Sequence, residues 1–209
     1  MKNRFDEEIN GLYLQIVSMA TNTESAVELL SQAMNGERND IMEEVEEKNR
    51  EIEKLSKESD AACVNLLLRF HPVARDLRRI SSATKIIADL ERIGDNALDV
   101  AEVMLYCKNH ELYSEIFLDK MCMSVKKMVE DAVQSYIASD ISLAAEVEKM
   151  DDTVDEYFLK AKESLIALIR ASSSSSDEAP DLMMIAKYLE RMGDHAASIS
   201  HWVLYEQGE

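Results

Sequence analysis

Glycine and proline are scarce in this sequence, with five and two residues among 209. Both residue types are enriched at turns, so their scarcity excludes a fold that is rich in tight turns. The helix-favouring residues alanine, leucine, methionine, glutamate and lysine are abundant instead. The strict alternation of apolar and polar residues that predicts strands is nearly absent. We therefore expect long helices joined by few connections.

The sequence also lacks segments that would direct it to or through a membrane. Its first residues, Met-Lys-Asn-Arg-Phe-Asp-Glu-Glu, have no apolar core of a signal peptide, and no apolar run approaches the length that spans a bilayer. The three cysteines, Cys63, Cys107 and Cys122, have no metal-ligand spacing and are expected to be reduced thiols. These absences predict a cytoplasmic protein without a transmembrane segment.

Basic residues are outnumbered. The chain has 23 lysines and arginines against 41 aspartates and glutamates, which gives a formal net charge of −18. This balance disfavours general binding to nucleic acid or to an anionic membrane surface. It suits basic partners, cations or simple solubility. Hydrophobic residues make up 46% of the chain, which is enough for a folded core.

Catalytic motifs are missing as well. The sequence has no glycine-rich phosphate loop, no nucleophile elbow and no Cys/His metal spacing. Di-iron carboxylate enzymes use Glu-x-x-His pairs in a helical bundle, and none of His71, His110, His195 and His201 has glutamate three residues before it. His195 beside Asp194 suggests a phosphorelay histidine only weakly, and a surface or packing role is favoured. We therefore predict that the protein is not an enzyme.

What the chain does contain is a repeated motif. Residues 90–95 read Leu-Glu-Arg-Ile-Gly-Asp and residues 189–194 read Leu-Glu-Arg-Met-Gly-Asp. A repeat at this separation indicates a duplicated module. Each copy carries two carboxylates four residues apart, which lie on one face of a helix: Glu91 with Asp95, and Glu190 with Asp194.

A weaker repeat adds a second polar pair to each half. The segment 45–53 aligns with the segment 147–155, so Asn49 and Glu53 match Asp151 and Asp155. Two carboxylates at this spacing repel each other, and a cation removes that cost. Two such pairs on adjacent helices would offer oxygen ligands to a divalent or ferric metal, including magnesium. In so acidic a chain, however, such pairs also arise by chance on solvated faces.

Helical periodicity covers almost the whole chain and predicts six long helices. We expect them at about residues 5–34, 39–70, 73–107, 113–138, 142–171 and 177–205, with Ser172–Ser176 as a loop. Pro72 should interrupt the backbone and push His71 toward extended geometry. Short connections imply antiparallel neighbours. The fold is therefore predicted to be all-α, with two tandem three-helix bundles related by duplication, one over residues 1–110 and one over residues 111–209.

Three segments resemble the PhoU family of phosphate-signalling proteins. They are Pro-Val-Ala-Arg-Asp-Leu-Arg-Arg-Ile at 72–80, Asp-Leu-Glu-Arg-Ile-Gly-Asp-Asn at 89–96 and Tyr-Leu-Glu-Arg-Met-Gly-Asp-His at 188–195. The resemblance implies two tandem three-helix bundles. It also implies a negative regulator of the phosphate-starvation response that links the ATPase subunit of the phosphate ABC transporter to a membrane sensor histidine kinase.

The resemblance also implies metal sites. Some members of the family bind multinuclear iron or zinc through Glu/Asp-x-x-x-Asp motifs. Carried over to this chain, the motifs fall on Glu91, Asp95, Glu190 and Asp194, and the companion pairs fall on Asp151, Asp155, Asn49 and Glu53. Asn49 departs from the pattern, because an amide is a possible oxygen ligand but brings no charge. A homodimer is compatible with such a fold.

Three alternatives stay open from sequence. Gly94 and Gly193 interrupt good helices at about 1 kcal/mol each, either for close helix packing or for room beside the carboxylates. A basic cluster, Arg75, Arg78 and Arg79, either contacts an anion or pairs within the chain, and pairing is favoured. The alternative to a regulator is a metal-binding carboxylate protein, for storage or as a metal-dependent enzyme, without a signalling role.

Overall fold

The computed structural model describes residues 2–38, 40–171 and 177–208. It contains seven α-helices and, over these residues, no strand. Their bounds are α1 Lys2–Met34, α2 Met42–Phe70, α3 Arg75–Met104, α4 Glu111–Glu115, α5 Leu118–Ala138, α6 Ile141–Arg170 and α7 Ala179–Gln207. The predicted all-α fold is confirmed, and the predicted loop Ser172–Ser176 lies outside the described residues.

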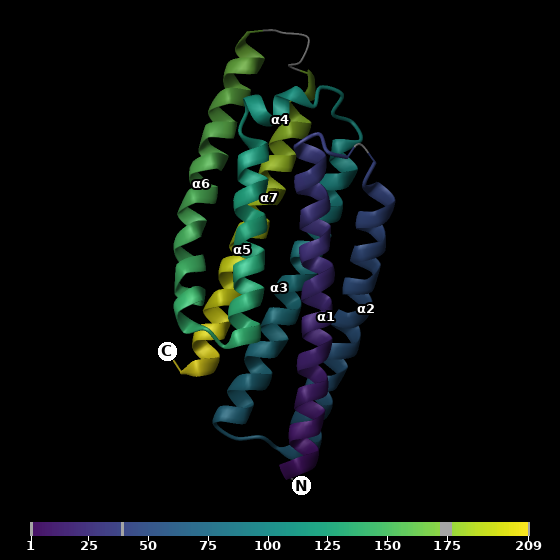
Figure 1. The fold of residues 1–209 in the computed structure, drawn as a ribbon, viewed down its shortest axis with the longest axis vertical. Coiled ribbons are helices and arrows are strands. Elements are labelled where there is room, and N and C mark those ends of the chain that lie inside the picture. Colours follow the sequence, from purple (N-terminus) through teal and green to yellow (C-terminus); the bar gives the residue numbers. More distant parts are fainter. Residues whose placement is uncertain (1, 39, 172–176, 209) are drawn as a thin grey trace.

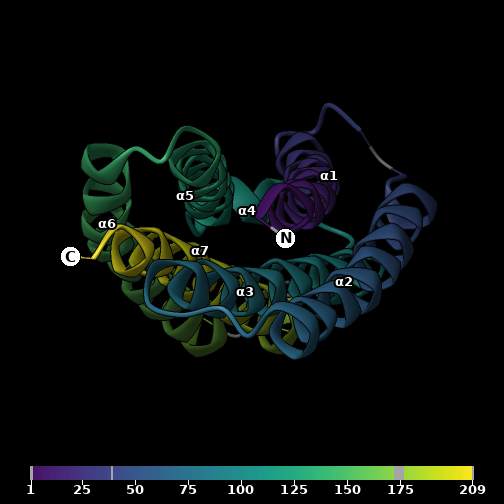
Figure 2. The same ribbon diagram turned by 90° about the horizontal axis from the view of Figure 1, so that it is seen from below.

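The long helices form two layers (Figures 1 and 2). Helices α2, α3, α7 and α6 lie side by side in a curved layer, and α1 and α5 cover one face of it. Helix α3 ends where α7 begins, so these two central helices run antiparallel and join the halves of the molecule (Figure 1). The first half is the bundle α1–α2–α3, and the second half is the bundle α5–α6–α7.

One continuous apolar core runs through both halves. It follows the helical period: Ile86, Leu90 and Ile93 on α3 and Leu189 on α7 are each at most 1% exposed. Burying a side chain of this size contributes about 1.5–3 kcal/mol. The core therefore supplies the main stabilisation of the fold and joins the two bundles through α3 and α7.

One predicted helix is broken. The run expected at 113–138 is divided into α4 and α5 by Phe117, which has a left-handed backbone with φ of 67°. In a continuous helix, Leu112 and Leu118 would point in different directions, because six residues span more than one and a half turns. The break turns the chain so that both side chains are buried. Apolar periodicity alone does not reveal such a change of direction.

The turn at Pro72 also differs from its prediction. His71 adopts a left-handed conformation with φ of 47°, so the prediction of extended geometry was wrong. Its backbone N–H donates to the carbonyl oxygen of Leu67 at 3.3 Å, which closes the last turn of α2. This hydrogen bond offsets the cost of the strained backbone.

The helices do not have the composition of membrane spans. Across the part of the chain that the structure describes, none combines the length and the apolar character needed to cross a bilayer.

Candidate functional site

The structure brings each repeated motif beside its companion pair. In the first half, Asn49 and Glu53 on α2 face Glu91 and Asp95 on α3, and these four residues are called the first site. In the second half, Asp151 and Asp155 on α6 face Glu190 and Asp194 on α7, and these four are called the second site. Equivalent residues of the duplicated modules therefore occupy equivalent places.

The motif glycines allow the helices to approach closely at both sites. A Cβ atom on Gly94 would lie 2.8 Å from Oδ1 of Asn49 and 2.9 Å from Cδ1 of Ile52. A Cβ atom on Gly193 would lie 3.2 Å from Cγ1 of Val154 and 3.5 Å from Oδ1 of Asp151. Close packing thus explains both glycines, and it also places the companion residue next to the motif.

The second site concentrates negative charge. Burial, then the charges on Asp194 and Asp155, raise the pKa of Asp151 from 3.8 to about 6. Burial and the charge on Glu190 also raise the pKa of Asp194, which Lys187 partly offsets. Lys187 forms an ion pair with Glu190. Because four carboxylates face this single paired lysine, the site has a net attraction for cations.

The first site is more nearly satisfied by the protein itself. Burial raises the pKa of Asp95, whereas the Asn49 side chain opposes this by stabilising the carboxylate. Arg92 lies 3.4 Å from Asp95, and the hydroxyl of Ser56 donates to Oε2 of Glu91 at 2.8 Å. Asn49 is only 4% exposed, and its Oδ1 has no hydrogen-bond partner among the described residues. The two sites are therefore alike in position and different in charge.

Both sites open on the same side of the molecule. Helices α1 and α5 cover one face of the four-helix layer (Figure 2), and α3 and α7 are flanked by α2 and α6 within it. The partly exposed Glu91, Asp95 and Glu190 and the exposed Asp194 must therefore lie on the uncovered face. A large partner could contact the two sites at once.

No ready-made metal site is present as the side chains stand. Over the described ranges, no three histidine, cysteine, aspartate or glutamate side chains gather closely enough to hold an ion. The donor set nevertheless fits hard or borderline cations, since the second site offers only carboxylate oxygens. Burial and then the charges of neighbouring carboxylates raise the pKa of Asp151, and a cation would neutralise those charges. The predicted role of all eight residues in metal binding stays a prediction.

Positions that differ between the two motif copies form the junction of the bundles. The hydroxyl of Ser198 donates to Oδ2 of Asp89 at 2.7 Å, and Nδ1 of His195 lies 2.9 Å from Oδ1 of the same carboxylate. In the related contact, Tyr188 and Arg191 of α7 lie beside Asp99 of α3. Burial raises the pKa of Asp99, and these two side chains lower it by a smaller amount. His195 therefore contacts a carboxylate of the other bundle, and its role as a surface or packing residue stays a prediction.

The basic cluster at the start of α3 is partly used inside the chain. Nε of Arg79 lies 3.6 Å from Oε1 of Glu206 near the end of α7. Burial raises the pKa of Glu206, and the charges on Arg79 and Arg75 oppose this effect. This arrangement supports the intramolecular interpretation of Arg79 and Arg75. Nε of Arg78 is buried without a partner among the described residues.

Sequence reasoning missed several residues around the sites. Ser56 follows Glu53 by one helical turn on α2, and this spacing could have revealed it. Asp60 follows by another turn, and its pKa is raised by burial and then by Glu91. Lys187 precedes Glu190 by three residues and was also detectable. The pairing of Asp89 with residues of α7 could not be predicted from residue spacing, because the partners are more than 100 residues apart in the sequence.

Comparisons with known proteins give one consistent family. The model described as "PhoU domain" matches the chain twice, over residues 16–104 and 118–203. A phosphate-specific transport system accessory protein PhoU homolog of Clostridium acetobutylicum is 28% identical over 205 residues, covering 96% of this chain and 93% of the relative. One of the same name from Aquifex aeolicus is 32% identical over 178 residues, covering 85% and 80%.

Solved structures agree in fold. The crystal structure of PhoU from Pseudomonas aeruginosa matches with a TM-score of 0.88 and 28% identity, covering 97% of this chain and 98% of the other. The phosphate transport system regulatory protein PhoU from Streptococcus pneumoniae matches with a TM-score of 0.87 over 98% and 97%. Its 23% identity supports a shared fold alone.

Proposed function

The chain belongs to the PhoU family, and we propose that it is a cytoplasmic, non-enzymatic negative regulator of phosphate uptake and phosphate-starvation signalling. It acts by protein contact with the ATPase subunit of the phosphate ABC transporter and with a sensor histidine kinase. The names of its relatives, which are accessory proteins of the phosphate-specific transport system, support a role in phosphate transport.

The main observation in support of the docking proposal is that the two sites are exposed on the same face of the molecule. Carboxylates on α3 and α7 lie on the uncovered face of one layer, and the formal charge of the whole chain is −18. Such a surface attracts basic residues and steers their approach. Transporter state would then control the docked population through differential affinity, without any chemistry at the site.

The test is affinity capture from native cell membranes in high and in low phosphate. We compare the unsubstituted chain with a variant carrying alanine at Glu91, Asp95, Glu190 and Asp194. The proposal expects phosphate-dependent recovery of the transporter ATPase or the kinase, and loss of that recovery in the variant.

A matched control removes the same charge elsewhere. It carries alanine at four other exposed glutamates: Glu46, Glu58, Glu146 and Glu163. Capture that survives this control but not the site variant assigns docking to the two sites. Equal loss in both would show a general charge effect, and recovery of neither partner by the unsubstituted chain would contradict the regulatory role.

Metal binding by the same carboxylates is a second proposal. The second site offers four oxygen-donor side chains and an excess of negative charge, which suits iron, zinc or magnesium. When bound, the ion would neutralise the neighbouring charges that, after burial, raise the pKa of Asp151. Titration of the chelated protein with each metal, followed by thermal unfolding, tests this: a rise in Tm that alanine at Asp151 and Asp194 abolishes is the expected result.

These measurements also separate the alternative role. A metal-storage protein or metal-dependent enzyme would co-purify with several metal atoms per chain, show redox or hydrolytic turnover, and capture neither transport partner. If alanine at the leading carboxylates abolishes capture while chelation has no effect, the metal is dispensable for docking. We also propose that the chain forms a homodimer, with which the fold is compatible, and sedimentation of the purified chain tests this.

A further inference from the structure

The two bundles touch along a second seam, between α1 and α5. Both helices lie on the same face of the four-helix layer, and they run antiparallel (Figures 1 and 2). This seam joins less of the core than the seam between α3 and α7, and polar contacts lie toward its two ends. In the first half of α1 and at the end of α5, the hydroxyl of Tyr13 donates to the carbonyl oxygen of Ile137 at 3.2 Å, and its ring lies 5.7 Å from that of Tyr136.

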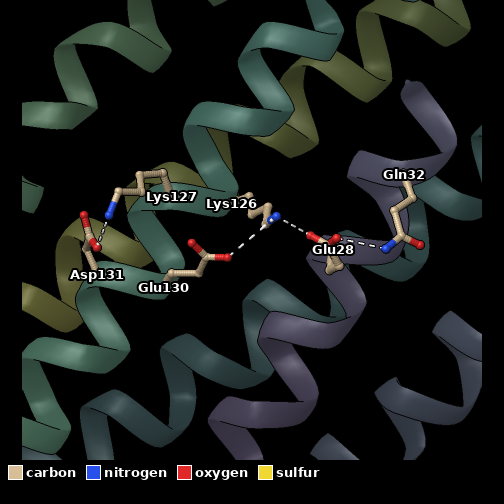
Figure 3. A network of polar contacts seen from close by, with 6 residues as sticks. All are labelled: Glu28, Gln32, Lys126, Lys127, Glu130 and Asp131. Atoms are coloured by element: carbon tan, nitrogen blue, oxygen red, sulfur yellow. Dashed lines mark hydrogen bonds and ion pairs between the residues drawn. The ribbon is translucent and has the colours of Figure 1, made fainter. Parts of the chain in front are cut away.

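An ion pair joins the opposite end of the seam. Lys126 of α5 reaches across to Glu28 of α1, as Figure 3 shows, and lies 3.8 Å from Glu130 on its own helix. Nε2 of Gln32 donates to Glu28 at 2.9 Å, which holds the acceptor in place. Glu28 and Lys126 remain 38% and 31% exposed. A pair this accessible to solvent is weak and is screened by salt.

The space on either side of this ion pair is not filled by side chains. One groove of about 430 Å³ is lined by residues of α1, of the turn that follows it and of α5, including Asn35 and Met123. Another of about 460 Å³ lies toward α2 and includes Arg38 and Lys48. Both share Glu28 and Lys126 in their walls. The ion pair therefore stands between two open grooves.

The seam between α3 and α7 has the opposite character. Ile93 and Leu90 of α3 and Met192 and Ile199 of α7 are at most 1% exposed, and the hydrogen-bonded contacts of Asp89 lie beside them. Separating these helices would open a cavity in a close-packed core. Of the two seams between the bundles, the one between α1 and α5 is the less extensive and therefore opens at the smaller cost.

We propose that Glu28 and Lys126 form a latch between the bundles. When the latch releases, α1 and α5 separate at its end while α3 and α7 stay packed and act as the hinge. The Tyr13–Ile137 contact keeps the far end of the seam together. Opening joins the two grooves into one cleft and gives the protein two states that a docking partner can select.

Distances between pairs of nitroxide spin labels test this in the full-length protein. Cysteine is introduced at exposed positions, and the three native cysteines are buried and do not compete for label. The pairs are Thr21 with Met123 for the latch end, Leu14 with Ile137 for the far end, and Ala88 with Met184 for the hinge.

Three perturbations weaken the ion pair: the substitution Lys126→Glu, the milder substitution Lys126→Gln, and a higher salt concentration with Glu28 and Lys126 both unsubstituted. Each should add a population several ångströms longer for the latch-end pair only. The charge exchange Glu28→Lys with Lys126→Glu should restore the short distance. An unchanged latch-end distribution under all three perturbations overturns the proposal. The proposal is also overturned if the distance between the labels on α3 and α7 lengthens together with the other two distances, because that result indicates a general loss of packing instead of hinge motion.

Discussion

Replacing Asp151 by asparagine should stabilise the metal-free protein at neutral pH. The substitution reproduces what the first half already has at Asn49, and it removes a charge that burial disfavours and that four neighbouring carboxylates repel. A pKa raised from 3.8 to about 6 corresponds to a gross cost of about 3 kcal/mol for ionising Asp151 in the folded state. Asp151 is partly exposed, so solvent screening reduces the expected gain to about 1 kcal/mol.

The pH dependence identifies the cause. Because the folded-state pKa is raised, the folded chain binds this proton more tightly than the unfolded chain does. The contribution of Asp151 to stability should therefore fall as the pH rises from about 4 to about 6 and then level off. Asparagine does not titrate, so the gain from Asp151→Asn should be near zero at about pH 4 and complete by about pH 7.

Urea unfolding in chelator at these two pH values measures the effect, with the exposed Glu146→Gln as control. Destabilisation by Asp151→Asn near neutral pH, or a gain equal at both pH values, would refute the electrostatic reasoning. Under the metal proposal, saturating metal should reverse the order of stability, because the substituted site loses a charged ligand.

Two further substitutions test the helix contacts and the turn geometry. Gly94→Ala should destabilise the protein by about 1–2 kcal/mol in urea unfolding, because the new Cβ atom would lie within 3 Å of Asn49 and Ile52. Gly193→Ala should change stability by less than about 1 kcal/mol, because its Cβ atom has more room. Equal effects of the two substitutions would contradict this difference in packing. Ser139→Gly should raise stability by about 0.5 kcal/mol, because the exposed Ser139 ends α5 with φ of 52°. A lower Tm for Ser139→Gly would show that the serine side chain contributes more than the backbone strain costs.

The internal duplication shows which positions the fold reuses and which it changes. Glu91 and Glu190, with the glycines that follow them, occupy the same places in both bundles. The differing pairs Asp89/Tyr188 and Asp99/Ser198 meet at the junction between the copies. Because the two copies differ at these positions, Asp89 of α3 meets the hydroxyl of Ser198 on α7, and Asp99 of α3 meets the hydroxyl of Tyr188 on α7.

Much of the fold and of the sites was accessible from sequence because it depends on local spacing. The helical period predicted the long helices, and the spacing of Glu91 with Asp95 placed both carboxylates on one helix face. The repeated hexapeptide predicted two equivalent modules and, with neighbouring segments, the family. These features need only residues within a few turns of each other, or a comparison of the chain with itself.

Tertiary structure decided what depends on segments that are distant in sequence. Asn49 is buried where Gly94 lets α3 approach α2, so the first site encloses an amide where the second has a partly exposed carboxylate. The turn at Phe117, the junction of Asp89 with α7 and the Glu28–Lys126 latch arise only when separate helices pack. Periodicity tells which face of a helix is apolar, but the neighbour that covers that face, and the charges left facing each other at its edges, are determined by packing in three dimensions.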